Sequence, residues 1–431
     1  MARSSSKGVR IAALVGTAIL GAAGLSACSG DGGGSEGGDQ TITILSSWAT
    51  GQATGDQLNK NIEAFTEKTG IKVEVEEVNN DDVDKAYEAS ALAGEQADIV
   101  VLNLTPSSAD WLPDGLVVDT EQYMNDWGIA DKLQQGAIDY WTNENGVNGF
   151  PFIGFNWPIW YNMDLLAQAG VDAVPATFDE FLDTSAKLRD AGIQPFALGG
   201  KDWTAQNFIT WMGQQYVAPE KMATVFAEGG WCSEDVVKGL DLISTMRDEN
   251  VFIDDVAGYD GDTMTNAYFT GVAAMMPAGS WTYTNEAGAE VAAHTELAGF
   301  PVPEGGHYTN PSGYNGHSAG FFLSPNAEDN IDAVQQFMEF MYSDEVLKGW
   351  VSDASQILDA KPEVVAGAES EAPLVVAGGA LGEDNTSWLL LPDEYLPAGT
   401  DWGPTIASEF LGQTGTTGAD LCKSLDAEYA N

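Results

Sequence analysis

The alternation of strands and helices along the first quarter of the chain constrains the fold more than any other feature. Residues 41–45, 71–76 and 99–102 predict strands, the last a continuous apolar run typical of a fully buried strand. Helical periodicity lies between them, and Gly70 supplies the C-terminal stop of the first helix. This order favours parallel β-α-β units with right-handed crossovers, so the sequence predicts an α/β fold.

The N-terminal region has the pattern of a secretory signal peptide over residues 1–27: basic residues, a short apolar run and small residues before a cut. The Leu-Ser-Ala-Cys stretch at 25–28 resembles the lipobox of bacterial lipoproteins, whose cysteine becomes the lipidated N-terminus. The resemblance implies cleavage before Cys28, a Gly-rich tether over 28–40 and anchoring to the outer face of the cell membrane. A plain signal peptide with an incidental cysteine is the alternative.

Size and charge narrow the function classes. Cleavage before Cys28 leaves 404 of the 431 residues (431 − 27), too many for one core, so two or more lobes are expected. The chain carries 17 basic and 65 acidic residues, a net charge of −48. This charge argues against nucleic acid and anionic lipid as partners and fits a neutral or cationic ligand.

Two cysteines, Cys232 and Cys422, remain once Cys28 is assigned to the lipid. An even pair outside the cell is compatible with one disulfide, and two buried free thiols are the alternative.

Several short segments, in this order along the chain, resemble the extracellular solute-binding proteins of ABC importers, the family that includes maltodextrin-binding proteins. The segments are 65–73, 97–100, 149–151, 160–166, 268–276 and 279–281. The resemblance implies a two-lobe, periplasmic-binding-protein-like α/β fold with a hinge, an interlobe ligand cleft and no enzymatic activity.

The resemblance also implies lobe boundaries. The N-terminal lobe would comprise 40–154 plus 303–324, and the C-terminal lobe 155–302 plus 325–431. Apolar residues at helical spacing in 334–342 indicate a core-facing helix, which these boundaries place in the C-terminal lobe.

A sugar site requires flat aromatic platforms and side chains that both donate and accept hydrogen bonds. Thirteen tryptophans are present, several in predicted loops. Position against the family pattern, or at a strand end, selects the candidate ligand-binding residues Trp281, Trp203, Trp48, Trp402, Asn103 and Asn156. Tyr314 and Asn315 are added because they belong to a predicted flexible polar loop that could reach the cleft.

Motifs for catalysis or metal binding are not evident. Residues 316–320 fit G-x-S-x-G, but a strand follows where a nucleophile elbow needs a helix, and no histidine follows His317. Three scattered histidines do not make a zinc site, and the acidic residues around Gly258 and Gly261 do not match calcium-loop spacing. We therefore predict no catalytic residue, no metal and no cofactor.

Together these features predict a lipid-anchored, monomeric binding protein that captures a carbohydrate, favoured as an oligosaccharide, and delivers it to an ABC permease. A binding protein for a cationic solute or peptide is one alternative, because carboxylates and tryptophans could form a cationic cage. A secreted glycoside hydrolase is the other, because no sequence with this many carboxylates excludes a catalytic pair.

Overall fold

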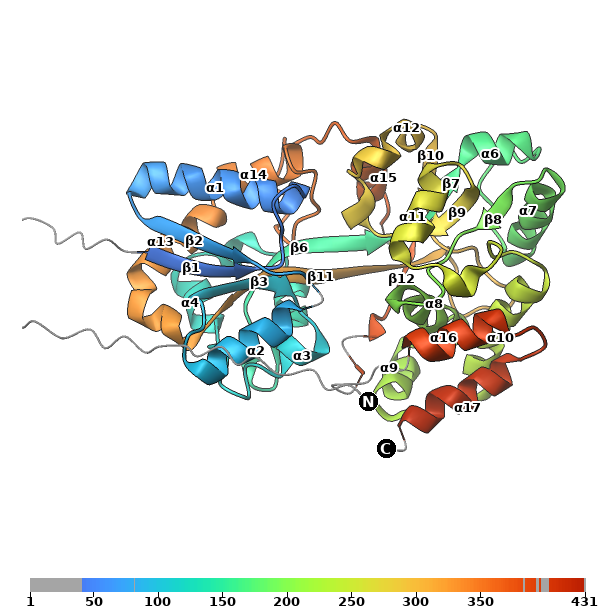
Figure 1. Cartoon of the computed structure of the whole chain (residues 1–431), viewed down its shortest axis with the longest axis horizontal. Coiled ribbons are helices and arrows are strands. Elements are labelled where there is room, and N and C mark those ends of the chain that lie inside the picture. Colours follow the sequence, from blue (N-terminus) through green and yellow to red (C-terminus); the bar gives the residue numbers. More distant parts are fainter. Residues whose placement is uncertain (1–40, 81, 383, 393–394, 397–402, 430–431) are drawn as a thin grey trace, which may run out of the picture. The chain divides into compact units, whose positions relative to one another are not determined.

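The computed structural model describes residues 41–431 apart from 81, 383, 393–394, 397–402 and 430–431 (Figure 1). The predicted signal peptide, the tether with Cys28, and Trp402 lie outside the described residues. The described helices are α1 Ala53–Thr69, α2 Val83–Ala93, α3 Pro106–Ala109, α4 Glu121–Asp126, α5 Gln135–Tyr140, α6 Met163–Gln168, α7 Phe178–Asp190, α8 Trp203–Gly213, α9 Pro219–Glu228, α10 Glu234–Asp248, α11 Gly261–Phe269, α12 Ala289–Ala292, α13 Ile331–Met341, α14 Asp344–Ser352, α15 Pro373–Gly379, α16 Gly403–Gly412 and α17 Gly418–Glu428. Short 3-10 turns are η1 Ala130–Lys132, η2 Val256–Gly258, η3 Ser280–Thr282, η4 Glu286–Gly288 and η5 Pro325–Asn330.

The first sheet has the strand order β12-β11-β3-β1-β2, with β6 also paired to β11. Its strands are β1 Thr41–Ser46, β2 Lys72–Glu77, β3 Ile99–Asn103, β6 Phe150–Trp157, β11 Ser312–Leu323 and β12 Ser387–Leu389. Strand β1 pairs in parallel with both β2 and β3, which confirms the predicted β-α-β units. Helix α1 ends at Thr69, and Gly70 follows at φ 77°, a left-handed conformation that glycine adopts without a Cβ clash.

The second sheet has the order β10-β7-β9-β8, and a two-stranded ribbon of β4 and β5 lies apart from both sheets. The bounds are β4 Thr142–Asn143, β5 Gly146–Val147, β7 Ile159–Asn162, β8 Gln194–Phe196, β9 Ala273–Pro277 and β10 Thr295–Ala298. Strand β9 is buried along its whole length, between antiparallel β7 and parallel β8.

Two hydrophobic cores accompany the two sheets. We call the cluster around the first sheet the first core and the cluster around the second sheet the second core. Strand β6 joins them, with Ile153 in the first core and Trp157 in the second. Strand β11 returns in the opposite direction, from Tyr314 in the second core to Ala319 in the first (Figure 1).

The predicted lobe boundary at residue 324 is wrong for the segment that follows it. Helices α13 and α14 bury Phe337 and Trp350 in the first core, and the chain remains there as far as Ala360. The physical reason is that β11 ends paired with β3, which leaves the next helices beside the first sheet. After Tyr314, the next fully buried residue of the second core is Leu374.

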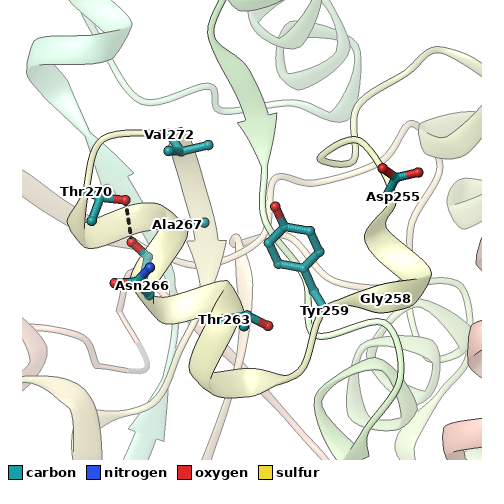
Figure 2. A pocket seen from close by; sticks show the side chains of 8 residues that line it. All are labelled: Asp255, Gly258, Tyr259, Thr263, Asn266, Ala267, Thr270 and Val272. Atoms are coloured by element: carbon teal, nitrogen blue, oxygen red, sulfur yellow. Dashed lines mark hydrogen bonds between the residues drawn. The ribbon is translucent and has the colours of Figure 1, made fainter.

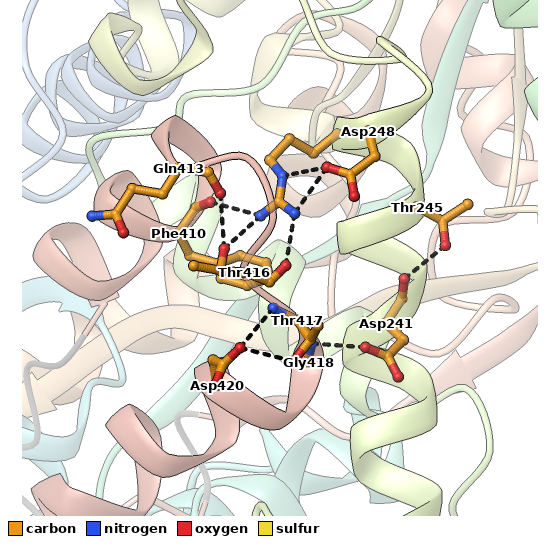
Figure 3. Close-up of polar contacts among 10 residues, drawn as sticks. Asp241, Thr245, Asp248, Phe410, Gln413, Thr416, Thr417, Gly418 and Asp420 are labelled. Carbon is orange, nitrogen blue, oxygen red and sulfur yellow. Dashed lines mark hydrogen bonds and ion pairs between the residues drawn. The ribbon is translucent and has the colours of Figure 1, made fainter.

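The C-terminal helices are held on α10 by polar contacts (Figure 3). The buried guanidinium of Arg247 donates to the carbonyl oxygens of Phe410 at 3.1 Å and Thr416 at 2.7 Å. The Gly418 N–H donates to Asp241 at 2.7 Å. These bonds satisfy a buried cation, so they fix the loop before α17.

The structure joins Cys232 to Cys422 by a disulfide, with 5.0 Å between the Cα atoms and 190 residues between them in sequence. Beside it, the Asp426 carboxylate accepts from the N–H groups of Gly230 at 2.8 Å and Trp231 at 2.7 Å. Helix α17 is therefore tied to the loop before α10 covalently and by hydrogen bonds.

Candidate functional site

Four aromatic side chains gather where β6 meets the second core. The rings of Trp157, Trp203 and Trp281 lie 5.4, 5.3 and 5.9 Å apart pairwise, and Phe155 lies 5.7 Å from Trp281. Trp157 is 4% exposed, whereas Trp203 is 47% and Trp281 49% exposed. We call these four residues the aromatic group. It presents two half-exposed indole rings on a buried third one.

Local structure fixes the two exposed rings. Trp203 opens α8, where the Asp202 carboxylate caps the helix by accepting from the Thr204 N–H at 2.9 Å. Trp281 lies in η3, just beyond β9. A Cβ on Gly279 would lie 2.1 Å from the Trp281 ring, so only glycine lets this ring fold back over the chain.

Buried side chains support the aromatic group from below. The Tyr314 ring packs against Trp157 and Trp211 at 6.0 and 5.1 Å, and its hydroxyl is 2.8 Å from the Thr210 hydroxyl. Tyr314 is fully buried, so the structure does not support its predicted contact with ligand. Its role here is to hold Trp157 in place.

Trp48 is placed in the first core, not at the aromatic group. It is 7% exposed, and rings of Phe152, Phe321 and Trp350 surround it at 6.1, 5.8 and 5.2 Å. The prediction that Trp48 faces ligand is therefore not supported, because helix α14 and the two joining strands cover its indole.

The three asparagines predicted to bind ligand differ in their exposure and in their hydrogen-bond partners. Asn156 is buried, and its amide nitrogen donates to the Gly378 carbonyl at 2.8 Å while its oxygen accepts from the Tyr283 hydroxyl, so both of its polar atoms are engaged within the protein. Its partner across the strands, Asn315, is exposed. Asn103 is partly exposed at the carboxyl end of β3.

Carboxylates near Trp203 are already engaged. Asp202 accepts from the Gly261 N–H at 2.6 Å, and Asp260 pairs with Lys201 at 2.9 Å. Hydrogen bonds from Thr263 and then Lys201 hold the pKa of Asp260 well below its ordinary value. Asp260 therefore stays ionised, and both carboxylates already have hydrogen-bond partners, which leaves the indole rings as the available surface at this point.

Phe155, Trp157 and Tyr283 are not among the site residues predicted from the sequence. Phe155 and Trp157 lie in an apolar strand, where an aromatic residue is the expected core pattern, and Tyr283 follows a short turn that has no motif of its own. The available signal for Trp157 was its position one residue after Asn156, a predicted site residue, in the strand that joins the two cores.

A model of the family described as bacterial extracellular solute-binding protein matches residues 48–348, more than half of the chain. The chain belongs to this family. Its members are binding proteins and not enzymes, as the sequence predicts.

Solved structures share the fold over nearly the whole chain, which confirms the predicted two-lobe α/β fold. A probable secreted solute-binding lipoprotein from Streptomyces coelicolor is 31% identical, with a TM-score of 0.81 over 92% of this chain and 100% of that one. A chitin oligosaccharide binding protein is 20% identical, with a TM-score of 0.74 over 91% of this chain and 99% of that one.

Curated relatives match over shorter stretches. The osmoprotective compounds-binding protein GgtB of Synechocystis sp. (strain ATCC 27184 / PCC 6803 / Kazusa) is 26% identical over 197 residues, 45% of this chain and 44% of that protein. The chain spans about half the length of the curated relatives that it matches.

The G-x-S-x-G segment of this solute-binding protein lies inside β11, not at a strand-to-helix turn, so it has no nucleophile-elbow geometry. Within it, His317 Nδ1 lies 2.6 Å from Asp359 Oδ1, and Asp359 is 1% exposed. Burial raises the pKa of Asp359, and the contact with His317 opposes that shift. The pair is a part-buried polar contact, with the Asp359 carboxylate beside Gly154 of β6.

Metal binding and membrane spanning find no support in the described part of the protein. Over residues 41–431 with the gaps given above, no group of three or more His, Cys, Asp or Glu is arranged to hold a metal ion. None of the helices described over the same residues is long and apolar enough to cross a membrane.

A surface pocket of about 400 Å³ lies between η2 and α11 of the solute-binding protein (Figure 2). It is lined by Asp255, Gly258, Tyr259, Thr263, Asn266, Ala267, Thr270 and Val272. None of these eight residues belongs to the aromatic group. The Thr270 hydroxyl donates a hydrogen bond to the Asn266 carbonyl oxygen at 2.7 Å. We therefore place the candidate site at the aromatic group.

Proposed function

We propose that this solute-binding protein captures a neutral oligosaccharide at the aromatic group and delivers it to the permease of an ABC importer. The observation that carries the proposal is the pair of half-exposed rings, Trp203 and Trp281, 5.9 Å apart and both backed by Trp157. Sugar rings present C–H faces that pack on indole, and two adjacent platforms suit a ligand of more than one ring.

Charge supports a neutral ligand over a cationic one. A cationic cage needs carboxylates that are free to face the ligand beside the aromatic faces. Asp202 and Asp260, the carboxylates next to Trp203, are instead used by Gly261 and Lys201. The chitin oligosaccharide binding protein with the same fold is consistent with a saccharide.

A lipid on Cys28 would hold the protein at the outer face of the cell membrane, where such a binding protein meets its permease. The family's extracellular designation and the similarity to a probable secreted lipoprotein support this anchor. Replacement by Cys28→Ala should abolish the incorporation of radiolabelled fatty acid into the protein. Incorporation equal to that of wild type would contradict the lipid anchor.

The test is a thermal-melt screen of the protein against chito-, xylo- and malto-oligosaccharides, with spermidine and glycine betaine as cationic and zwitterionic comparisons. A ligand at about a hundred times its Kd adds about 2.7 kcal/mol to the free energy of unfolding, so the midpoint rises visibly. Titration calorimetry of each hit then follows affinity between low and high salt. Salt-independent binding of a saccharide supports the proposal, whereas shifts only with spermidine, weakening steeply with salt, would overturn it.

A further inference from the structure

One buried amide lies between two segments that are far apart in sequence. Asn156 in β6 donates through its amide nitrogen to the carbonyl oxygen of Gly378 in α15 at 2.8 Å, and its amide oxygen accepts from the Tyr283 hydroxyl. Asn156 and Tyr283 are both buried. Because an unpaired buried polar group is costly, these bonds hold the three residues together.

Tyr283 ends the turn that carries Trp281. Its N–H donates to the Ser280 carbonyl at 3.1 Å, so η3 closes directly onto it. The other end of the turn is fixed by Trp160, whose indole N–H donates to the Ala278 carbonyl at 2.7 Å. The half-exposed Trp281 therefore sits on a short turn held at both ends by buried side chains.

Gly378 makes direct contact with the same tyrosine. A Cβ at this position would lie 2.4 Å from the Tyr283 ring, so the ring rests on the α15 backbone. The chain reaches α15 after leaving the first core, where Ala360 is buried, and α15 places Leu374 in the second core. The segment that ends in α15 is thus a third connection between the cores, in addition to β6 and β11.

We propose that Asn156 is a positioning residue, which with Tyr283 and Gly378 forms a latch that fixes the Trp281 platform to β6 and α15. The latch makes the orientation of Trp281 depend on two of the three connections between the cores. Asn156 acts through Tyr283 and does not touch ligand. The inference rests on the proposed function in one respect, that Trp281 is a ligand platform.

The first experiment needs no ligand. Hydrogen exchange of the full-length protein, followed by mass spectrometry, compares wild type with Tyr283→Phe, which removes only the hydroxyl. Loss of a buried hydrogen bond should speed amide exchange in 279–285 and in α15 by about tenfold.

A matched control is Tyr268→Phe. Tyr268 is also fully buried in the second core, but its hydroxyl lies 2.8 Å from the Thr295 hydroxyl in β10 and not beside Asn156. We expect its exchange changes at β10 and not at 279–285. Equal exchange at 279–285 in wild type and Tyr283→Phe would overturn the latch.

A second variant separates the two bonds of Asn156. Asn156→Asp keeps an acceptor for the Tyr283 hydroxyl but removes the donor to Gly378, so α15 should exchange faster than the η3 segment. If η3 and α15 loosen equally, the two bonds do not act separately and the geometry of the latch is wrong.

The last readout is affinity for a saccharide found in the screen. We expect Tyr283→Phe to weaken binding about tenfold and Tyr268→Phe to leave the Kd unchanged. Faster exchange at 279–285 with an unchanged Kd would overturn the positioning role. If no saccharide binds wild type, the proposed function fails, and the exchange experiment still decides whether the latch exists.

Discussion

Trp48 and Trp281 occupy equivalent places in the two sheets, yet the structure treats them differently. Each follows a buried strand at its carboxyl end, Trp48 after β1 and Trp281 after β9. Trp48 is buried by rings from three distant segments, whereas Trp281 is packed on one side by Phe155 and Trp157 and is half-exposed on the other. A position at a strand end therefore does not by itself expose a tryptophan ring. The elements that fold over the strand end determine whether the ring is covered.

The largest loss of stability is expected from replacing Trp48, the buried one of the two tryptophans. Trp48→Ala removes an indole enclosed by Phe152, Phe321 and Trp350, and truncation of a buried tryptophan typically costs about 3–5 kcal/mol of unfolding free energy. Urea unfolding measures the loss. Trp48→Phe is the control, because it keeps a ring in the site and should lose less. A near-neutral Trp48→Ala would mean that Trp48 is not part of the first core.

The disulfide allows the two cores to be compared directly. Cys232 and Cys422 both lie on the second-core side, and the bond closes a segment of 190 residues. Replacing both with alanine should cost about 2–5 kcal/mol, because the unfolded chain is no longer constrained. Hydrogen exchange should show the loss in α10 and α17 and not in α1 or α13. Equal loss in both sets of helices would show that the two cores unfold as one unit.

Replacing Trp281, the half-exposed tryptophan, should weaken ligand binding more than it lowers the stability of the fold. Trp281→Ala removes a half-exposed platform, and loss of one stacked ring costs about 1–3 kcal/mol in other systems. Titration calorimetry with the saccharide found in the screen measures this loss. Urea unfolding of the same variant should change by less than the Trp48→Ala variant changes. An unchanged Kd in the folded Trp281→Ala variant would remove Trp281 from the site.

The sequence predicts the strand–helix order well because that order depends on local chemistry. The stop at Gly70 and the apolar face of α13 follow from residues within one turn or one helix. The sequence does not predict which sheet α13 packs against. An amphipathic stripe shows that one face of a helix is buried, but it does not show which element covers that face. The predicted boundary at 324 failed for this reason.

The candidate site divides in the same way. Trp203 and Trp281 were selected by sequence and lie together in the structure, while Trp48 and Tyr314 were selected on similar grounds and are covered. Asn156 shows the remaining limit, because an amide that looks ready for a ligand is used by Gly378 and Tyr283, 222 and 127 residues away. Such long-range partners leave no pattern in a single sequence.

The smallest effect concerns the strand that joins the two regions. Asp359 is buried beside Gly154 of β6, and burial raises its pKa, so the folded protein favours the protonated carboxyl. Its contribution to stability is therefore fully present below the ordinary pKa of about 4 and is lost as the pH rises through the raised value.

Asp359→Asn keeps an oxygen that can accept from His317 and carries no charge. We expect this variant to gain stability relative to wild type as the pH rises from 4 to 7, measured by urea unfolding at each pH. Asp344→Asn is a control on the surface, because hydrogen bonding by Lys132 lowers the pKa of Asp344 and its stability trend with pH has the opposite sign. If Asp359→Asn instead loses stability relative to wild type as the pH rises, the contact with His317 more than compensates the cost of burying the Asp359 carboxylate.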